Sequence, residues 1–298
     1  MHILIGVDGS QAASLACQFV ANRTWPIGTR VELLAVGSWA GWASAEDTRV
    51  ELETLETALD ERAEVLRRRG LGVATDVVPG PPADALMARA VDSFADLLVV
   101  GNRGLGPLGS AVFGSVSAHL VDHAGCPVLV VRSPDASRML LATDGTASSR
   151  SIPRVLAAWG PALRGMPVEV VSVAPRDDFV TPWSVAGDTG NGAETRELAM
   201  HTEIAQRVAD QMMDLGWHAA AIAPRGDPGR TILTASEEWQ ADLIVTGSRS
   251  LGTIQRLLLG SVAHHVVMHA RSSVLVMRGL VPARTTEPAA VAARLAFG

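Results

Sequence analysis

The sequence contains one segment twice, and this internal repeat constrains the fold more than any other feature. Residues 97–132 read LLVVGNRGLGPLGSAVFGSVSAHLVDHAGCPVLVVR, and residues 243–278 read LIVTGSRSLGTIQRLLLGSVAHHVVMHARSSVLVMR. The two segments align without a gap at a spacing of 146 residues, so that Gly101 corresponds to Gly247. A gap-free repeat of this length indicates two copies of one domain, each carrying the same candidate site.

The beginnings of the two copies also match, at a shorter spacing of 136 residues. Residues 2–10 (HILIGVDGS) align with residues 138–146 (RMLLATDGT), which places Asp8 opposite Asp144. The spacing therefore grows by ten residues before the glycine-rich segments are reached. We expect an insertion in the second copy, mostly within residues 174–194, directly after its second strand.

Length and composition agree with two compact domains in a soluble cytoplasmic protein. We expect the 298 residues to divide into a first domain at residues 1–135, a second at residues 136–280 and a C-terminal tail at residues 281–298. The net charge of −6 and the pI of about 5.7 predict no binding to nucleic acid or to an anionic membrane. No apolar run approaches the roughly 20 residues that span a bilayer, and the first residues lack a signal-peptide pattern. The two cysteines fit neither a disulfide framework nor a zinc site.

The chain contains no lysine, so arginine supplies all 25 basic residues. Codon bias is a sufficient cause, but the chemical consequence holds whatever the cause. A Walker-A loop, a protein-kinase ATP site, a Schiff-base enzyme and a phospho-receiver domain of the usual kind all need a lysine. The composition therefore disfavours these four classes.

Each copy is predicted to alternate five strands with four helices. The apolar runs ILIGV, LLVV and VLVV are typical of strands that helices cover on both faces of a parallel sheet. This alternation predicts an α/β fold in which each copy is an open five-stranded parallel sheet, with strand order 3-2-1-4-5. In the first copy we expect strands at Ile3–Val7, Arg30–Val36, Val73–Val78, Asp96–Val100 and Val128–Val131, and helices at Ser10–Asn22, Ala45–Arg69, Ala83–Ser93 and Ser115–Ala124.

The strand order predicts where a ligand binds and how the copies meet. Open α/β sheets bind ligands beyond the carboxyl ends of the strands, where the strand order reverses. Asp8 follows the first strand and Gly101 the fourth, so we expect the carboxylate to face the glycine-rich loop. The fifth strands, Val128–Val131 and Val274–Met277, would be apolar edges if unpaired. We expect them to pair with each other as a pseudo-two-fold dimer within one chain, which leaves other surfaces for a homodimer.

The glycine-rich loop has the composition of a phosphate site. Gly101, Gly104 and Gly114 let main-chain N–H groups approach an anion closely. Gly114 and Ser115 open a helix, whose first N–H groups are unpaired. The alternative is structural: the glycines make tight turns and Ser115 caps the helix. The matching glycines and serine of the second copy favour the phosphate interpretation.

Together these features resemble the universal stress protein family in its tandem two-domain form. The resemblance rests on Asp8 after the first strand, on G-x2-G-x9-G-S after the fourth and on the terminal CPVLVVR, and it covers nearly the whole chain. It implies a Rossmann-like fold, pairing through the fifth strands, a homodimer, and binding of ATP (or ADP or AMP) with Mg²⁺. The implied roles are Asp8 for the ribose and the phosphate-bound Mg²⁺, the backbone of Val36 for adenine, and the loop for ribose and phosphates. The implied binding residues are Asp8, Val36, Gly101, Arg103, Gly104, Gly114, Ser115 and Val116 in the first copy, and Asp144, Val173, Gly247, Arg249, Ser250, Gly260, Ser261 and Val262 in the second, with Asp144 contacting metal only through nucleotide-bound Mg²⁺.

The second copy departs from the motif at one position, because Ser250 stands where the first copy has Gly104. If this position needs positive φ or very close backbone approach, serine costs about 1 kcal/mol or more. If it needs only an N–H donor, serine is harmless. Arg249 and Arg256 add positive charge to the second loop. We expect nucleotide in the first copy and also in the second.

Two further patterns have a functional and a structural interpretation. His119 and His123, like His265 and His269, are four residues apart on a predicted helix, a spacing that can bind metal. Without the glutamate of HExxH, packing near a helix C-terminus is the simpler role. Trp39, Trp42 and Trp183 follow the second strands, where they could stack on adenine or belong to the core.

These observations predict a nucleotide-binding stress-response regulator with little or no turnover. One alternative is a slow Mg-dependent ATPase whose metal is held by Asp8. A nucleotide-free scaffold is the other. No Ser-His-Asp order, paired catalytic carboxylates, HExxH or flavin signature stands out, and so no catalytic residue is assigned.

Overall fold

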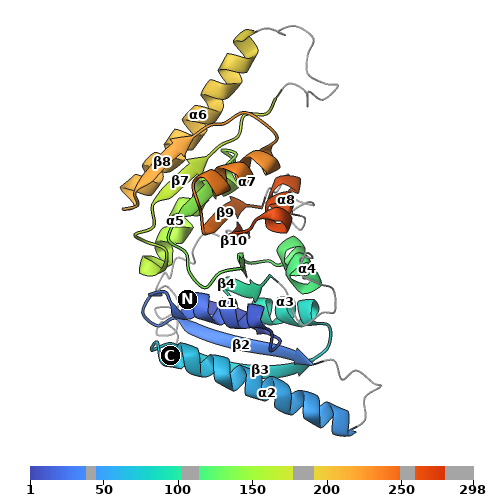
Figure 1. Cartoon of the computed structure of the whole chain (residues 1–298). Coiled ribbons are helices and arrows are strands. Elements are labelled where there is room, and N and C mark those ends of the chain that lie inside the picture. The colour runs from blue at the N-terminus through green and yellow to red at the C-terminus, as the bar shows by residue number, and fades with distance from the viewer. Residues whose placement is uncertain (38–44, 103–113, 177–190, 249–258, 279–298) are drawn as a thin grey trace, which may run out of the picture.

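The computed structural model describes residues 1–37, 45–102, 114–176, 191–248 and 259–278. Their strands form a single ten-stranded sheet in the order β3-β2-β1-β4-β5-β10-β9-β6-β7-β8 (Figure 1). Within each half the order is 3-2-1-4-5 and the pairs are parallel. The strands are β1 (His2–Val7), β2 (Arg30–Gly37), β3 (Gly72–Pro79), β4 (Leu97–Gly101), β5 (Val128–Val131), β6 (Met139–Ala142), β7 (Val168–Val171), β8 (Ala219–Ile222), β9 (Leu243–Gly247) and β10 (Ser273–Met277).

The predicted α/β fold with helices on both faces is confirmed. Each expected element of the first half is present, with ends that differ by at most two residues. The two five-stranded sheets are continuous with each other through their fifth strands. The helices are α1 (Gln11–Ala21), α2 (Ala45–Arg67), α3 (Pro82–Asp92), α4 (Ser115–His123), α5 (Ala147–Ala158), the short 3-10 turn η1 (Gly160–Ala162), α6 (Asn191–Asp214), α7 (Pro228–Glu238) and α8 (Ser261–His269).

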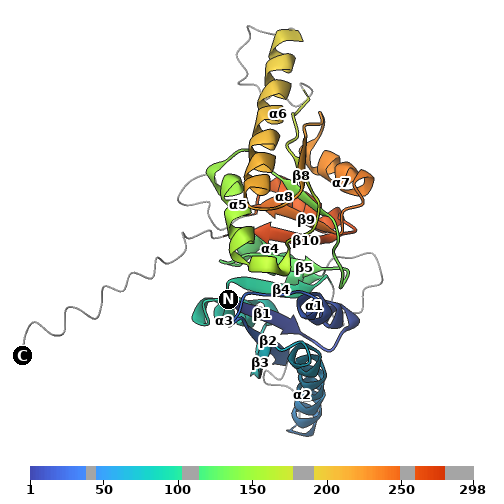
Figure 2. The same cartoon turned by 90° about the vertical axis from the view of Figure 1, so that its left-hand side faces the viewer.

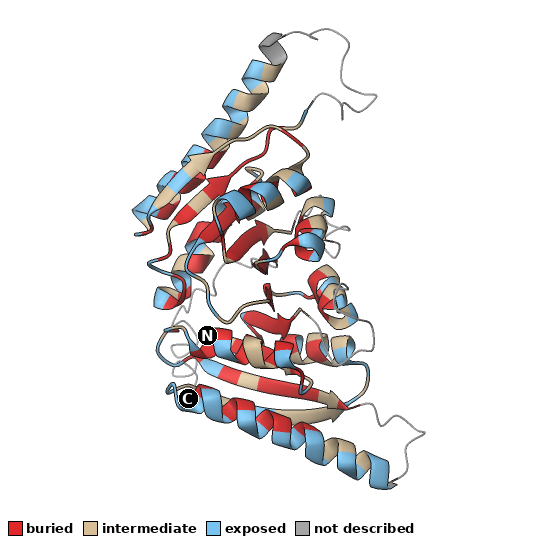
Figure 3. Ribbon diagram, viewed as in Figure 1, coloured by how far each residue is buried: buried red, intermediate tan, exposed pale blue. Residues whose placement is uncertain are grey.

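Both faces of the sheet are buried by helices, and each face has its own hydrophobic core. The core on one face includes residues of α1, α2, α5 and α6, and the core on the other includes residues of α3, α4, α7 and α8. Figure 3 shows buried strands between helices whose outer surfaces are exposed. Ile3, Leu4 and Ile5 illustrate the cause: consecutive side chains point to opposite faces, and all three are fully buried.

The fifth strands pair with each other, which confirms the predicted junction between the two copies. β5 and β10 are antiparallel, with Leu129 opposite Leu275 at the centre of the register. Figure 2 shows the two halves stacked along one sheet through these strands. The pairing supplies hydrogen-bond partners to two apolar strands that would otherwise be open edges.

Two arginines cross this junction in opposite directions. Arg132 follows β5 and donates a hydrogen bond from Nη2 to the carbonyl oxygen of Val267 in α8, at 2.5 Å. Arg278 follows β10 and donates from Nη1 to the carbonyl oxygen of Val121 in α4, at 2.7 Å. Burial lowers the pKa of Arg278, and the nearby Asp122 carboxylate opposes this shift. The reciprocal contacts give the junction its pseudo-two-fold character.

Candidate functional site

A pocket lies at the carboxyl ends of β6, β7 and β9 in the second half, where the strand order reverses. Its volume of about 140 Å³ is roughly ten times what a single buried water needs. The pocket is therefore larger than a site for single water molecules. Six of the eight residues predicted for the second site line this one pocket: Asp144, Val173, Gly247, Gly260, Ser261 and Val262.

One wall of the pocket is the N-terminus of α8. The first hydrogen bond of this helix runs from His264 N–H to the carbonyl oxygen of Gly260, at 2.9 Å. The N–H groups of Ser261, Val262 and Ala263 precede that bond and have no partner within the helix. These three residues all line the pocket. Since a helix N-terminus also carries positive dipole charge, this wall favours an anion such as phosphate.

A second wall is the acidic turn that joins β6 to α5. Asp144 Oδ1 accepts hydrogen bonds from Thr146 N–H at 3.0 Å, from the Thr146 hydroxyl at 2.8 Å and from the Ser149 hydroxyl at 2.9 Å. Gly145, between Asp144 and Thr146 in the chain, has φ +73°, a conformation that favours glycine. The turn therefore fixes one carboxylate at the edge of a pocket whose other wall attracts anions.

The pocket lining also includes a histidine that the sequence interpretation missed, and a buried serine behind the lining holds it. His201 projects from α6 into the lining, and its Nδ1 lies 2.8 Å from the hydroxyl oxygen of Ser172, just after β7. Burial lowers the pKa of the His201 imidazole, and the carboxylates of Glu197 and Asp144 partly oppose the shift. The repeat contained a signal for this histidine. At the spacing of 146 residues, His201 of the second copy aligns with an apolar residue of the first, Leu55.

The predicted residues of the first half follow the corresponding strands. Asp8 follows β1, Val36 lies at the end of β2 and Gly101 ends β4, so all three are at the same edge of neighbouring strands. Ser10 N–H donates to Asp8 Oδ1 at 3.0 Å, and the Ser10 hydroxyl caps α1 by accepting from Ala13 N–H at 3.2 Å. Gly114, Ser115 and Val116 form the start of α4. Arg103 and Gly104, like Arg249 and Ser250 of the second half, lie outside the described residues.

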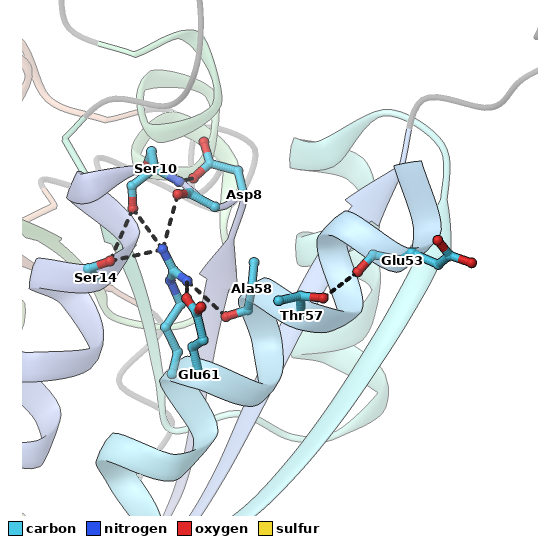
Figure 4. Close-up of polar contacts among 9 residues, drawn as sticks. Asp8, Ser10, Ser14, Glu53, Thr57, Ala58 and Glu61 are labelled. Atoms are coloured by element: carbon cyan, nitrogen blue, oxygen red, sulfur yellow. Dashed lines mark hydrogen bonds and ion pairs between the residues drawn. The ribbon is translucent and has the colours of Figure 1, made fainter. Parts of the chain in front are cut away.

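A buried arginine of α2 supports the turn between β1 and α1, which carries Asp8. Arg62 of α2 donates to the carbonyl oxygens of Gly9 and Ser10, at 3.0 and 3.3 Å, and to the Ser14 hydroxyl at 2.9 Å. Its other terminal nitrogen donates to the carbonyl oxygen of Ala58 at 2.9 Å. Figure 4 shows Ser10 and Ser14 on one side of this cluster and Ala58 on the α2 side. No motif of the sequence marks this arginine, and the second copy has valine at the equivalent position, 208.

The structure shows how the two helices after the glycine-rich loops begin. Gly114 and Gly260 are the N-cap residues of α4 and α8, both with φ −65°, so neither uses a conformation reserved for glycine. The structural alternative, in which Ser115 caps its helix, does not hold, because Gly114 is the N-cap residue and Ser115 is the first helical residue and exposed. Its hydroxyl is therefore not a capping group.

Gly101 has a structural reason to be glycine. A Cβ atom at this position would lie 2.6 Å from the main-chain carbon of Ala12, far inside contact distance. The close packing of α1 on β4 therefore requires glycine here. At the equivalent Gly247 a Cβ would lie 3.8 Å from Ser149, which is an ordinary contact.

In each of the helices α4 and α8, the two histidine rings of the pair stack on each other. His119 and His123 have ring centroids 4.3 Å apart, and His265 and His269 have the same separation. Nδ1 of the second histidine in each pair lies within hydrogen-bond distance of the carbonyl oxygen of the first, at 3.0 and 2.8 Å. Among the described residues no group of three or more His, Cys, Asp or Glu side chains is arranged to hold a metal ion. Trp39, Trp42 and Trp183 lie outside the described residues.

Comparisons with known proteins agree with the repeat and the fold. A universal stress protein of Mycolicibacterium smegmatis is 29% identical over 300 residues, which cover 93% of this chain and 96% of the relative. A universal stress protein of Mycobacterium tuberculosis is 28% identical over 304 residues, with the same coverage of each chain. The crystal structure of a universal stress protein from Archaeoglobus fulgidus matches with a TM-score of 0.67 at 18% identity, over 93% of this chain and 96% of that one. At that identity the last comparison supports the fold alone.

The helices in the described part of the chain are too short or too polar to cross a membrane. The model of the universal stress protein family matches twice, over residues 1–132 and over residues 136–278. These matches cover most of the 298 residues. The chain belongs to the universal stress protein family and carries one family domain in each half.

Proposed function

We propose that this protein binds adenine nucleotides at the carboxyl edge of both halves and acts as a stress-response regulator with little or no turnover. The observation that carries the proposal is the convergence of a fixed carboxylate, Asp144, and a helix N-terminus, at Ser261, in one pocket. A nucleotide presents the complementary groups, because its phosphates are anionic and its ribose hydroxyls donate hydrogen bonds. The ligand is ATP, or alternatively ADP or AMP.

The lining suggests how a nucleotide would be oriented. Phosphates would meet the N–H groups at the start of α8, where the dipole favours negative charge. The base would lie at the opposite wall, beside Val173, and the ribose near Asp144. The first site would use Val36 and Asp8 in the same way, with the N-terminus of α4 receiving the phosphates.

Mg²⁺ fits the chemistry of this site. The chain has no lysine to neutralise a triphosphate, so the charge would have to be balanced by arginine, helix dipoles and a metal. Mg²⁺ prefers carboxylate and phosphate oxygens, and Asp144 supplies a carboxylate to the lining. Asp144, and Asp8 in the first half, would hold nucleotide-bound Mg²⁺, which would neutralise phosphate charge.

The proposal extends to organisation and location. We propose domains at residues 1–135 and 136–280, followed by a tail at residues 281–298, and a homodimer in the cytoplasm. β5 and β10 pair with each other inside the shared sheet, so a second chain would have to bind to another surface.

Titration calorimetry with ATP and Mg²⁺ tests the proposal on the full chain. We expect two nucleotides bound per chain, and one after either Asp8→Ala or Asp144→Ala. Phosphate release should stay close to the uncatalysed rate, whereas turnover that Asp8→Ala abolishes would establish the slow ATPase instead. No binding, together with no ligand detected by mass spectrometry after purification, would leave the nucleotide-free scaffold.

A further inference from the structure

The two candidate sites differ in one pair of side chains at the same place. Leu34 pairs with Asp76 in the first half, and Val171 pairs with Ile222 in the second. Leu34 and Val171 are therefore equivalent positions. The residues that follow them, Ala35 and Ser172, are equivalent as well. The spacing of 146 residues between helices α2 and α6 makes Leu55 and His201 equivalent positions. The first half thus has two buried apolar side chains where the second has a hydroxyl and an imidazole.

The polar pair is oriented from inside the protein. Ser172 is fully buried, and its N–H is bonded to the carbonyl oxygen of Ile222 at 3.1 Å. Its hydroxyl lies 2.8 Å from Nδ1 of His201, which fixes the plane of the imidazole ring. His201 itself is only half-buried and lines the pocket. Among the described residues, none hydrogen-bonds to the other ring nitrogen, Nε2.

The position of His201 relates it to the nucleoside rather than to the phosphates. Its bonded partner, Ser172, directly precedes Val173 at the base end of the pocket, whereas the anion-binding wall starts at Gly260 on another strand connection. Asp144 and His201 line the same pocket, so the imidazole shares the cavity with the carboxylate of the acidic turn. A neutral imidazole held through Nδ1 has one remaining hydrogen-bonding group, Nε2. This nitrogen is therefore the one left for a ligand.

We propose that His201, positioned by Ser172, hydrogen-bonds to the nucleoside part of a nucleotide in the second site and makes the two sites of the chain unequal. The contact is to a ribose hydroxyl or to the base edge. The first site lacks it, because Leu55 and Ala35 offer no hydrogen-bonding side-chain group. This inference rests on the proposed nucleotide-binding function and concerns only the second of the two sites.

The test uses the full chain carrying Asp8→Ala, so that the second site is measured alone. The double variant His201→Leu with Ser172→Ala installs the side chains of the first half and leaves no orphaned hydroxyl. A neutral hydrogen bond contributes roughly 0.5–1.5 kcal/mol, so ATP affinity should fall about fivefold. Inorganic tripolyphosphate, measured by its competition with a fluorescent ATP analogue, should bind with unchanged affinity. His218→Leu is the matched control, because His218 is exposed and lies before β8, outside the pocket lining.

Each outcome decides the inference. Unchanged ATP affinity in the double variant would overturn it, as would an equal loss of ATP and tripolyphosphate affinity. If only ATP affinity falls, 2′-deoxyATP and purine riboside triphosphate then distinguish a contact to the 2′-hydroxyl from one to the 6-amino group. Absence of all nucleotide binding by the wild-type chain would instead contradict the proposed function. The thermal unfolding midpoint of the double variant controls for loss of fold.

Discussion

The guanidinium of Arg62 donates a hydrogen bond to the carbonyl oxygen of Gly9 at 3.0 Å, from a residue that is only 8% exposed. This contact joins helix α2 to the turn that carries Asp8, across 53 residues of sequence. Gly9 has φ +80°, so its carbonyl direction is set by the turn itself. A buried cation thus supports the first candidate site without lying in it, whereas Ile204 packs against Gly145 in the second half.

Arg62→Met should destabilise the protein and weaken only the first site. The carbonyl oxygens of Gly9, Ser10 and Ala58 would lose a charged donor, and bonds to charged groups contribute about 1.5–3 kcal/mol. We expect the free energy of unfolding in urea to fall by about 2 kcal/mol. Arg67→Met on the exposed surface of the same helix is the control. Equal loss of affinity at both sites in calorimetry would contradict a local effect.

Gly101→Ala should destabilise the protein and Gly247→Ala should not, although the two glycines occupy equivalent positions. The new methyl group at position 101 would lie 2.6 Å from the Ala12 backbone, and overpacking of this kind costs about 1–3 kcal/mol. At position 247 the nearest atoms are 3.8 Å away, so the change should stay within about 0.5 kcal/mol. Thermal unfolding of the two variants measures this difference. Equal stability would show that α1 and β4 are less closely packed than described.

Gly114→Val should lower ATP affinity without disturbing the fold. The N-cap conformation at φ −65° is open to any residue, so the helix can form. A branched side chain would obstruct the unpaired N–H groups at the start of α4. We expect affinity at the first site to fall at least about tenfold, or about 1.4 kcal/mol, with an unchanged circular dichroism spectrum. Gly125→Val is the control, since a Cβ there meets no atom within 4 Å. Unaltered binding in calorimetry would make this loop purely structural.

The stability of the wild-type chain should fall in acid relative to His201→Leu. Burial lowers the folded-state pKa of His201 below the ordinary value of 6.5, so the unfolded chain binds more protons between the two values. This contribution to stability is fully present above pH of about 6.5 and is lost as the pH falls through the folded-state pKa. Urea unfolding of both proteins at pH 7.5 and pH 5 measures the effect. His265, whose pKa is also lowered by burial, is common to both proteins and cancels in the comparison. A stability difference that does not change with pH would contradict the assignment.

The sequence determined the architecture because its signals are local or repeated. Continuous apolar runs such as those ending at Val7 and Gly101 specify buried parallel strands, and their alternation with helices leaves few topologies. The pairing of β5 with β10 was also predictable, because two apolar edges in one chain have each other as the nearest partner. Asp144 and Gly260 could be placed near one pocket on the same grounds, since both follow strands that end at one edge.

Only the tertiary structure decided which side chains meet at that edge. The bond between Ser172 and His201 joins residues 29 apart, and that between Arg62 and Ser14 joins residues 48 apart. Such contacts depend on the distance and rotation of helices packed on the sheet, which no local pattern encodes. The same packing gives Gly101 a reason to be glycine that Gly247 does not share, although the two occupy equivalent places in the repeat. The sequence repeats the backbone plan, and the packing of non-repeated side chains makes the two halves different.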